Sequence, residues 1–299
     1  MNKPFEKKAW IMVQKNPGSA ALNLAIENHV LQSTQNSSDV ILFLYINNNS
    51  VVIGKFQNPW IECNIPWLES EHIPICRRIS GGGTVWHDKG NLNWSFIGPR
   101  SNFKKTENLE FISGVLRDYG LAIEQNNRGD LLLHGKKVSG NALRFEGNRV
   151  LHHGTLLVNA NPEYLQKALD TSWHKDLEFS TPAVSSVKMN VCNLSDHIKA
   201  LEVSALKTRI SKAFVDRTNA HEYFLDPDNI INEAILEDRK TFESVDWTWK
   251  RSPPFSIVMQ NNLEHPISVE AGQVIPSYTK STEQDLSFDK WLRQNKYLC

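Results

Sequence analysis

The feature that most constrains the fold is a run of three glycines between two strand-like segments. The glycines occupy residues 81–83, directly after the stretch from Arg77 to Ser80, and residues 84–86 and 92–96 read as short strands. Glycine lets the backbone approach a ligand closely and adopt positive φ, and its N–H groups can form an anion-binding concavity. The pattern predicts a glycine loop held between strands. A plain surface turn is the alternative.

Two well-known phosphate-binding patterns are absent around this loop. The P-loop needs Gly-x-x-x-x-Gly-Lys-Ser/Thr, and the dinucleotide fingerprint needs Gly-x-Gly-x-x-Gly. Neither spacing occurs in the chain. Any nucleotide must therefore be held by another fold, in which Arg77 and Arg78 supply guanidinium charge suited to carboxylate or phosphate.

Length and composition exclude several classes of protein. The chain has 299 residues, 33 basic against 33 acidic, and four cysteines without Cys-x-x-Cys spacing. A polyanion-binding protein usually carries a basic excess, so nucleic acid is a poor candidate partner. The cysteines suit a reducing compartment and give no zinc pattern, and no apolar run reaches the ~18 residues of a membrane helix. With no secretory signal at residues 1–8, we expect a soluble, cytoplasmic protein.

Hydrophobic periodicity predicts alternating strands and helices along the chain. Strands are expected at residues 9–13, 40–46, 50–53, 73–77, 121–124, 131–134 and 149–158, and helices at 20–32, 64–71, 105–119, 162–170, 195–215 and 288–294. Asparagines at 47–49 predict a hairpin between the second and third strands. A composition change near residue 250 predicts a boundary between a domain over residues 1–250 and the remainder of the chain. Residues 251–299 would form a short C-terminal segment containing weak strands at 266–269 and 273–275.

A second informative block runs from Asp130 to residue 158. Lys137 follows a turn and precedes Ser139-Gly140, so it could reach a carboxylate or phosphate; a solvated lysine is the alternative. Asp130 is either a turn former or a carboxylate that helps to hold magnesium near a phosphate. His152 and His153 are adjacent on a predicted strand, so at most one of them faces any given pocket. Structural and functional interpretations of these histidines remain equally open.

No covalent nucleophile stands out. The Gly-x-Ser-x-Gly elbow is absent, and the histidines lack further ligands at a metal-binding spacing. Cys76 lies beside Arg77 but within an apolar run, where a buried strand residue is the simpler interpretation.

Taken together, these blocks make the chain resemble lipoate–protein ligases, within the biotin and lipoate ligase family. The resemblance covers about residues 10–256 and is carried by residues 52–64, 77–91, 130–142, 152–157 and 247–256, with a looser match over residues 185–194. It implies that residues 1–250 form a catalytic domain of α+β fold, a mixed β-sheet flanked by helices. Residues 251–299 would be a short C-terminal appendage, either a segment or a reduced accessory domain. It also implies a two-step reaction in which lipoate and ATP give lipoyl-adenylate, whose acyl group then passes to a lysine of an acceptor domain.

The resemblance also assigns roles to individual residues. Lys137 would be catalytic, touching the activated carboxyl and the α-phosphate, and Asp130 would lie at the nucleotide and magnesium position. The residues implied to bind lipoyl-adenylate are Arg78, Ser80, Gly81, Gly82, Gly83, Val85, His87, Ser139, Gly140, His153 and Thr155. Of these, His153 and Thr155 would follow the lipoyl pocket. The roles agree with the chemistry, because adenylation develops charge that preorganised N–H groups and cations stabilise.

The implied cofactors are ATP and magnesium, with lipoate as substrate. The implied partners are lipoyl acceptor domains of 2-oxoacid dehydrogenase complexes and the glycine cleavage H protein, with no nucleic acid or membrane. Residues 159–182 lack the cysteine that octanoyltransferases of the wider family use. Only 43 residues follow Ser256, fewer than in many ligases that perform both steps. A lipoyltransferase that takes preformed lipoyl-adenylate or a lipoylated donor, and a non-catalytic acyl- or nucleotide-binding protein, are the alternatives.

Overall fold

A computed structural model describes residues 9–218, 224–225, 229–259, 262–275 and 286–298. The chain divides into two compact units, each assembled from three stretches of sequence. Unit 1 comprises Met1–Asn48, His87–Asn161 and Lys188–Arg239, and unit 2 comprises Asn49–Trp86, Pro162–Val187 and Lys240–Cys299. Each unit has its own hydrophobic core. The predicted domain boundary near residue 250 is a separate matter from these units and stays a prediction.

Unit 1 is built on a mixed sheet of six strands in the order β10-β11-β6-β2-β1-β13. Strand β1 is parallel to β2 and β13, whereas β2, β6, β11 and β10 are antiparallel neighbours. A smaller antiparallel sheet has the order β7-β8-β9. The strands are β1 Ala9–Val13, β2 Val40–Ile46, β6 Asn91–Pro99, β7 Ile123–Gln125, β8 Leu131–Leu133, β9 Lys136–Ser139, β10 Asn141–Glu146, β11 Arg149–Leu157 and β13 Phe224–Leu225.

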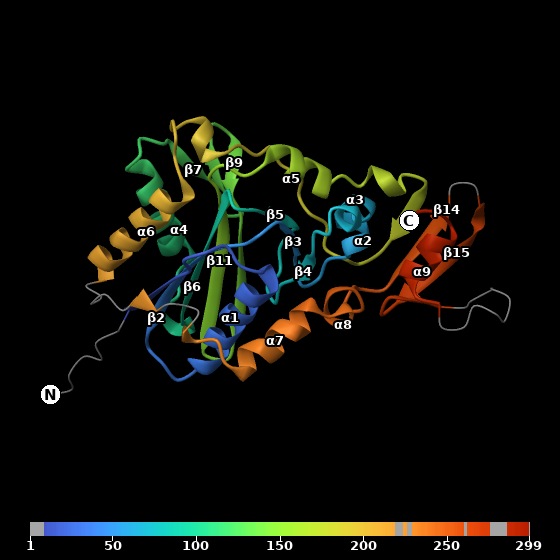
Figure 1. The fold of residues 1–299 in the computed structure, drawn as a ribbon, viewed down its shortest axis with the longest axis horizontal. Helices are drawn as coiled ribbons and strands as arrows, with labels where there is room; N and C mark the ends of the chain where they lie inside the picture. Colours follow the sequence, from blue (N-terminus) through green and yellow to red (C-terminus); the bar gives the residue numbers. More distant parts are fainter. Residues whose placement is uncertain (1–8, 219–223, 226–228, 260–261, 276–285, 299) are drawn as a thin grey trace. The chain divides into compact units, whose positions relative to one another are not determined.

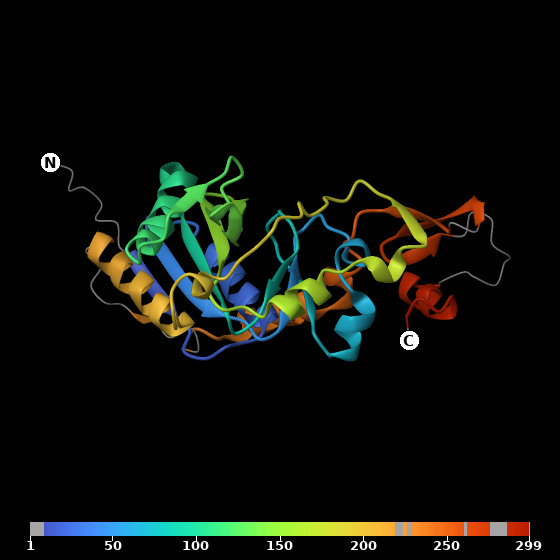
Figure 2. The ribbon, with the colours of Figure 1, turned by 90° about the horizontal axis from the view of Figure 1, so that it is seen from above.

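Helices cover both faces of the six-stranded sheet (Figures 1 and 2), because alternate strand residues point to opposite sides. Leu42 and Leu44 of β2 join a core with α4 (Lys105–Arg117) and α6 (Val203–Thr218). Between them in sequence, Phe43 and Tyr45 face the other way, and the Tyr45 hydroxyl donates to Glu27 of α1 (Ala20–Ser33) at 2.9 Å. Helix α1 begins at Ser19, whose Oγ accepts from the Leu22 amide.

Unit 2 contains two further sheets, one of three strands in the order β4-β3-β5 and one of four in the order β12-β14-β15-β16. Its core includes packed rings of Trp60, Phe255 and Phe288. The strands are β3 Ser50–Ile53, β4 Ile75–Arg77, β5 Val85–His87, β12 Leu177–Ser180, β14 Phe255–Met259, β15 Asn262–Glu270 and β16 Gln273–Ile275. The helices are α2 Pro59–Glu62, α3 Ile65–Ser70, α5 Pro162–Ala168, α8 Val245–Thr248 and α9 Phe288–Gln294. Two elements cross the division of the chain, since β5 ends at His87 of unit 1 and α7 is Glu233–Glu243.

The predicted hairpin over residues 40–53 is wrong, although both strands lie where they were expected. Strand β2 lies between β1 and β6 in the large sheet, while β3 pairs in parallel with β4. The intervening Asn47 is not a hairpin-turn residue. Its side chain is buried, accepts from Asn23 at 2.7 Å and lies 2.8 Å from His87 Nδ1.

The predicted helix over residues 195–215 starts too early. Residues Leu194–Asp196 form a short 3-10 helix capped by Asn193, and α6 begins only at Val203. Ala200 has φ of 59°, which lies outside the helical region. Lys137, predicted to follow a turn, belongs to strand β9.

Candidate functional site

The residues predicted to bind lipoyl-adenylate fall into two groups, one in each unit. Unit 2 holds Arg78, Ser80, Gly81, Gly82, Gly83 and Val85, and unit 1 holds His87, Asp130, Lys137, Ser139, Gly140, His153 and Thr155. Each group is organised by contacts within its own unit.

The glycine loop of unit 2 is shaped by Arg78. This side chain is 6% exposed, and its Nη2 donates to the carbonyls of Gly81 and Gly83, both at 2.7 Å. Its Nε donates to Ser80 Oγ at 3.1 Å, and its Nη1 donates to Val52 O at 3.0 Å. A guanidinium presents five donors in a rigid fork. Arg78 therefore fixes the positions of the loop carbonyls, a task that the sequence did not reveal.

Backbone geometry requires glycine at two positions around this loop. Gly82 is exposed and has φ of 88°, in the left-handed region where a side chain is strained. Gly54 approaches the loop so closely that a Cβ on it would lie 2.1 Å from the Gly82 carbonyl oxygen. The three-glycine run therefore has a conformational reason, as predicted for positive φ or close approach.

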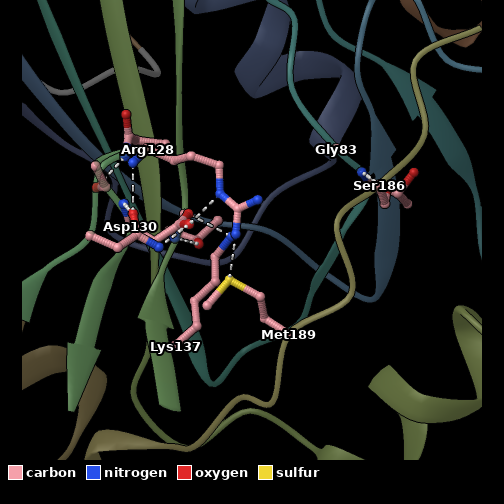
Figure 3. A network of polar contacts seen from close by, with 12 residues as sticks. Gly83, Arg128, Asp130, Lys137, Ser186 and Met189 are labelled. Atoms are coloured by element: carbon pink, nitrogen blue, oxygen red, sulfur yellow. Dashed lines mark hydrogen bonds and ion pairs between the residues drawn. The ribbon is translucent and has the colours of Figure 1, made fainter. Parts of the chain in front are cut away.

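A second segment of unit 2 is attached to the loop through Ser186. The Ser186 Oγ accepts from the Thr84 amide at 2.8 Å and from Gln57 Nε2 at 3.0 Å, and its own amide donates to Glu62 Oε1 at 3.0 Å. Figure 3 shows Ser186 beside Gly83, where an added Cβ would lie 3.0 Å from the hydroxyl. The sequence signal for this contact was only the looser match that begins at Ser185.

Arg77 holds residues 247–252 in place. It is fully buried, and its Nη2 donates to Thr248 O at 2.6 Å and to Ser252 Oγ at 3.0 Å. Its Nη1 donates to Gln57 O at 2.7 Å. Burial lowers the pKa of Arg77 to about 10, so the group stays cationic at neutral pH. Arg77 ties two segments of unit 2 together, and these described contacts are to the protein rather than to a ligand.

In unit 1, Lys137 forms an ion pair with Asp130. The two atoms Lys137 Nζ and Asp130 Oδ1 are 2.7 Å apart, with the lysine side chain 25% exposed and the aspartate 10%. Asp130 Oδ2 accepts from Asn126 Nδ2 at 2.9 Å and lies 3.6 Å from Arg128 Nε. Figure 3 shows Asp130 between Arg128 and Lys137, with the Met189 sulfur accepting from Arg128 at 3.3 Å. The lysine amine is thus held at a defined place.

The environment keeps Asp130 ionised. Burial alone would raise its pKa, but hydrogen bonds from Lys137 and Asn126 and the charges of Lys137 and Arg128 outweigh burial and lower it. Among the described residues, no three His, Cys, Asp or Glu side chains gather to hold a metal ion. The assignment of Asp130 to magnesium stays a prediction.

Two glycines give the lysine and its neighbours their space. A Cβ on Gly140 would lie 2.9 Å from both Cε and Nζ of Lys137, so the lysine side chain passes over this residue. A Cβ on Gly154 would lie 2.4 Å from the buried Trp94 ring and 2.6 Å from Gly140 O. Gly154 is therefore a packing requirement, because a ring and a backbone carbonyl cannot give way, whereas at Gly140 the flexible end of Lys137 could move aside.

The other predicted residues of unit 1 are divided between the sheet faces. His153 is buried, and its Nδ1 lies 2.9 Å from Glu27 of α1, whereas His152 lies 3.2 Å from Asn108 of α4. The two histidines thus point to opposite faces, as adjacent strand residues should. Thr155 Oγ1 accepts from the Gly140 amide at 3.3 Å, and the buried Ser139 hydroxyl has no hydrogen-bond partner among the described residues.

Similarity to known proteins defines the family of this chain. The family model for the lipoyl protein ligase A/B catalytic domain matches residues 19–215. A lipoate-protein ligase A of Psychrobacter cryohalolentis is 34% identical over 248 residues, covering 78% of this chain and 70% of the relative. A lipoate–protein ligase 1 of Staphylococcus aureus is 33% identical, covering 81% and 74%. The chain belongs to the lipoate–protein ligase A/B catalytic-domain family, a family of enzymes.

Relatives extend beyond the aligned part. A relative from Saccharomyces cerevisiae is 32% identical over 273 residues, covering 89% of this chain but 66% of the relative. The chain thus spans roughly two thirds to three quarters of the length of these curated relatives.

None of the described helices is long and apolar enough to cross a membrane.

Solved structures share the fold. A P. falciparum protein in complex with lipoate has a TM-score of 0.70 at 24% identity, covering 89% of this chain and 82% of that one. A bipartite lipoate protein ligase from Thermoplasma acidophilum, described with its E2 lipoyl domain, has a TM-score of 0.65 at 20% identity, covering 81% and 96%. A lipoate-protein ligase A bound with ATP has a TM-score of 0.62 at 20% identity, covering 81% and 96%. They confirm the α+β fold predicted from the sequence.

Proposed function

We propose that this enzyme activates lipoate with ATP and transfers the lipoyl group to a lysine of a lipoyl acceptor domain. The observation that carries the proposal is the Lys137 ammonium, fixed by Asp130 at 2.7 Å over the glycine at position 140. A preorganised cation of this kind stabilises charge that develops on a phosphoryl group. Named relatives support the substrates, since one is in complex with lipoate and another is bound with ATP.

The first step forms a mixed anhydride. A carboxylate oxygen of lipoate attacks the α-phosphorus of ATP, the bond to the β-phosphate oxygen breaks, and pyrophosphate leaves. Lys137 would stabilise the negative charge of the α-phosphate as the bond forms, and the glycine loop shaped by Arg78 would bind the acyl-adenylate through its backbone. Magnesium would come with the triphosphate and neutralise its charge.

The second step makes the amide. The neutral amine of the acceptor lysine attacks the carbonyl carbon of lipoyl-adenylate, AMP leaves with the bonding electron pair, and the amine loses a proton. The anhydride is already activated, so no nucleophile of this chain is required, in agreement with the buried state of Cys63, Cys76 and Cys192. The acceptors proposed are lipoyl domains, as the E2 lipoyl domain named with the archaeal relative suggests.

The competing function is transfer from preformed lipoyl-adenylate without activation. The intact mass of an acceptor domain separates the two. The domain is incubated with the chain and either lipoate, ATP and magnesium, or lipoyl-adenylate alone. We expect the mass to increase by one lipoyl group in both mixtures. An increase with lipoyl-adenylate only would establish transfer without activation, and no increase in either would overturn both functions.

A further inference from the structure

Lys137 is not held by its ion pair alone, because the loop that carries Asp130 is itself fixed. This loop connects β7 to β8 and contains Asn126, whose Oδ1 accepts from the amides of Arg128 and Asp130 at 3.0 and 2.9 Å. These contacts are local to the loop. They set its internal shape but not its position against the rest of unit 1.

Two longer contacts fix the position of the loop. Lys105 Nζ of α4 donates to Arg128 O at 2.6 Å, on the exposed side. On the other side, Asn141 Nδ2 of β10 donates to Gly129 O at 2.7 Å. Gly129 is the residue before Asp130 and has φ of 88°. Its carbonyl lies within reach of the Asn141 side chain. Asn141 therefore controls the residue adjacent to the carboxylate that binds Lys137.

The Gly129 carbonyl and His152 together hold the Asn141 amide in one orientation. A backbone carbonyl only accepts, so the amide nitrogen of Asn141 faces Gly129 and its Oδ1 faces His152 Nε2, 3.2 Å away. His152 must then carry its proton on Nε2, and its Nδ1 accepts from Asn108 Nδ2 of α4 at 3.2 Å. The assignment is consistent from end to end, because every donor in the series meets an acceptor.

Burial keeps this series in one protonation state. His152 is fully buried between the rings of Trp94 and Phe103, at 5.0 and 5.7 Å between centroids. Burial, with the charges of His153 and Lys105, lowers the pKa of His152 to about 3, so the imidazole is neutral and has a single N–H. A charged imidazole would instead offer two donors, and Asn108 Nδ2 would lose its acceptor.

We propose that Asn141, oriented by His152, is a positioning residue for Lys137: it fixes the Gly129 carbonyl and thereby the carboxylate to which the lysine amine is bound. The inference rests on the proposed function for its effect on catalysis. It assigns no direct contact with substrate to Asn141. Its removal should move the amine, and errors of about 1 Å in a catalytic group can lower rates on the order of 100-fold.

The test compares Asn141→Leu, Asn141→Asp and a matched control, Asn148→Leu. Leucine removes both amide contacts but keeps the branching of the side chain, whereas aspartate keeps an acceptor for His152 but loses the donor to Gly129. Asn148 lies at the turn of the same hairpin, with an exposed side chain. We expect both Asn141 variants to lower kcat for lipoate-dependent pyrophosphate release roughly 10- to 100-fold with KM for lipoate little changed. The melting temperature should fall by only a few degrees, because His152 and Gly129 lose at most one hydrogen bond each. The control should match the wild type.

A readout without catalysis separates this inference from the proposed function. In protein labelled with 15N and 13C at lysine, the Lys137 side-chain resonance is assigned by its loss in Lys137→Ala. We expect it to shift in both Asn141 variants and not in Asn148→Leu. If the wild type releases no pyrophosphate but the resonance still shifts in the Asn141 variants, the proposed function is overturned and the positioning role is supported. An unmoved resonance, or wild-type kcat in both Asn141 variants, would overturn the positioning role itself.

Discussion

The glycine loop of unit 2 and the Lys137 region of unit 1 are stabilised in different ways. The loop is held by a residue three to five positions away in sequence, since Arg78 donates to Gly81 and Gly83 carbonyls. Lys137 is held by Asp130, whose own loop depends on Asn141 and on His152 from another strand. The loop carbonyls are thus held by a neighbour in sequence, with Ser186 joining at Thr84 from farther along the chain, whereas the Lys137 region depends on several strands of the sheet. Substitutions should therefore act locally in unit 2 but propagate across strands in unit 1.

The largest effect is expected for Lys137→Ala. It removes the cation that would stabilise the α-phosphate, and loss of one such group costs roughly 100- to 1,000-fold in rate. Acceptor lipoylation, measured by intact mass, should fall by this factor while the unfolding midpoint changes little, because Asp130 retains Asn126 and Arg128. Lipoylation within a few-fold of the wild type would show that Lys137 has no catalytic role.

Arg78→Lys tests whether the guanidinium of Arg78 holds the glycine loop. A lysine keeps the charge but cannot reach Gly81, Gly83 and Val52 together, so buried carbonyls lose donors. We expect a loss of about 2 kcal/mol in the free energy of unfolding of unit 2, measured by chemical denaturation. We also expect weaker binding of a non-hydrolysable lipoyl-adenylate analogue. If lysine at this position left both quantities unchanged, the loop would be held by other contacts.

Gly82→Val tests the backbone conformation of the same loop. A β-branched residue at φ of 88° costs about 1–2 kcal/mol. Because residue 82 is exposed, the loop can relax toward another shape, and we expect analogue affinity, measured by calorimetry, to fall roughly tenfold with a melting temperature shift of only a few degrees. Gly120→Val, at φ of 80° with open space for a Cβ and outside the predicted binding residues, is the matched control. A large drop in melting temperature with affinity retained would make the loop structural only.

The smallest effect concerns the pH dependence of stability in unit 1. The pKa of His152 is lowered by burial from 6.5 to about 3, so the unfolded chain binds a proton that the folded chain does not. The contribution of His152 to the free energy of unfolding is fully present above pH 6.5 and declines as the pH falls toward 3. Between pH 7 and 5.5 we expect a loss of about 1 kcal/mol that is absent in His152→Gln. Equal losses in both proteins would contradict the buried neutral imidazole.

The sequence predicted the parts of the candidate site whose members are neighbours along the chain. The glycine loop, its positive φ at Gly82 and the opposite faces of His152 and His153 follow from local rules. Pairing partners were harder to predict. The hairpin over residues 40–53 failed because nothing local shows that β2 and β3 pair with different sheets.

The supporting residues were not predictable for the same reason. Asn141 and Ser186 look like ordinary polar residues, and only the fold brings them to Gly129 and Thr84. Arg77 was interpreted as a charge for a ligand, and its buried contacts with Thr248 arise 171 residues away. A long-range hydrogen bond leaves no periodicity for a single sequence to reveal.

Pyrophosphate release is the most direct measurement of the central claim, that this chain itself activates lipoate. The chain alone is mixed with lipoate, ATP and magnesium, with no acceptor domain and no second protein. We predict lipoate-dependent release of pyrophosphate that Lys137→Ala abolishes. If no pyrophosphate is released while supplied lipoyl-adenylate still modifies an acceptor domain, activation belongs to another protein and this chain is a transferase.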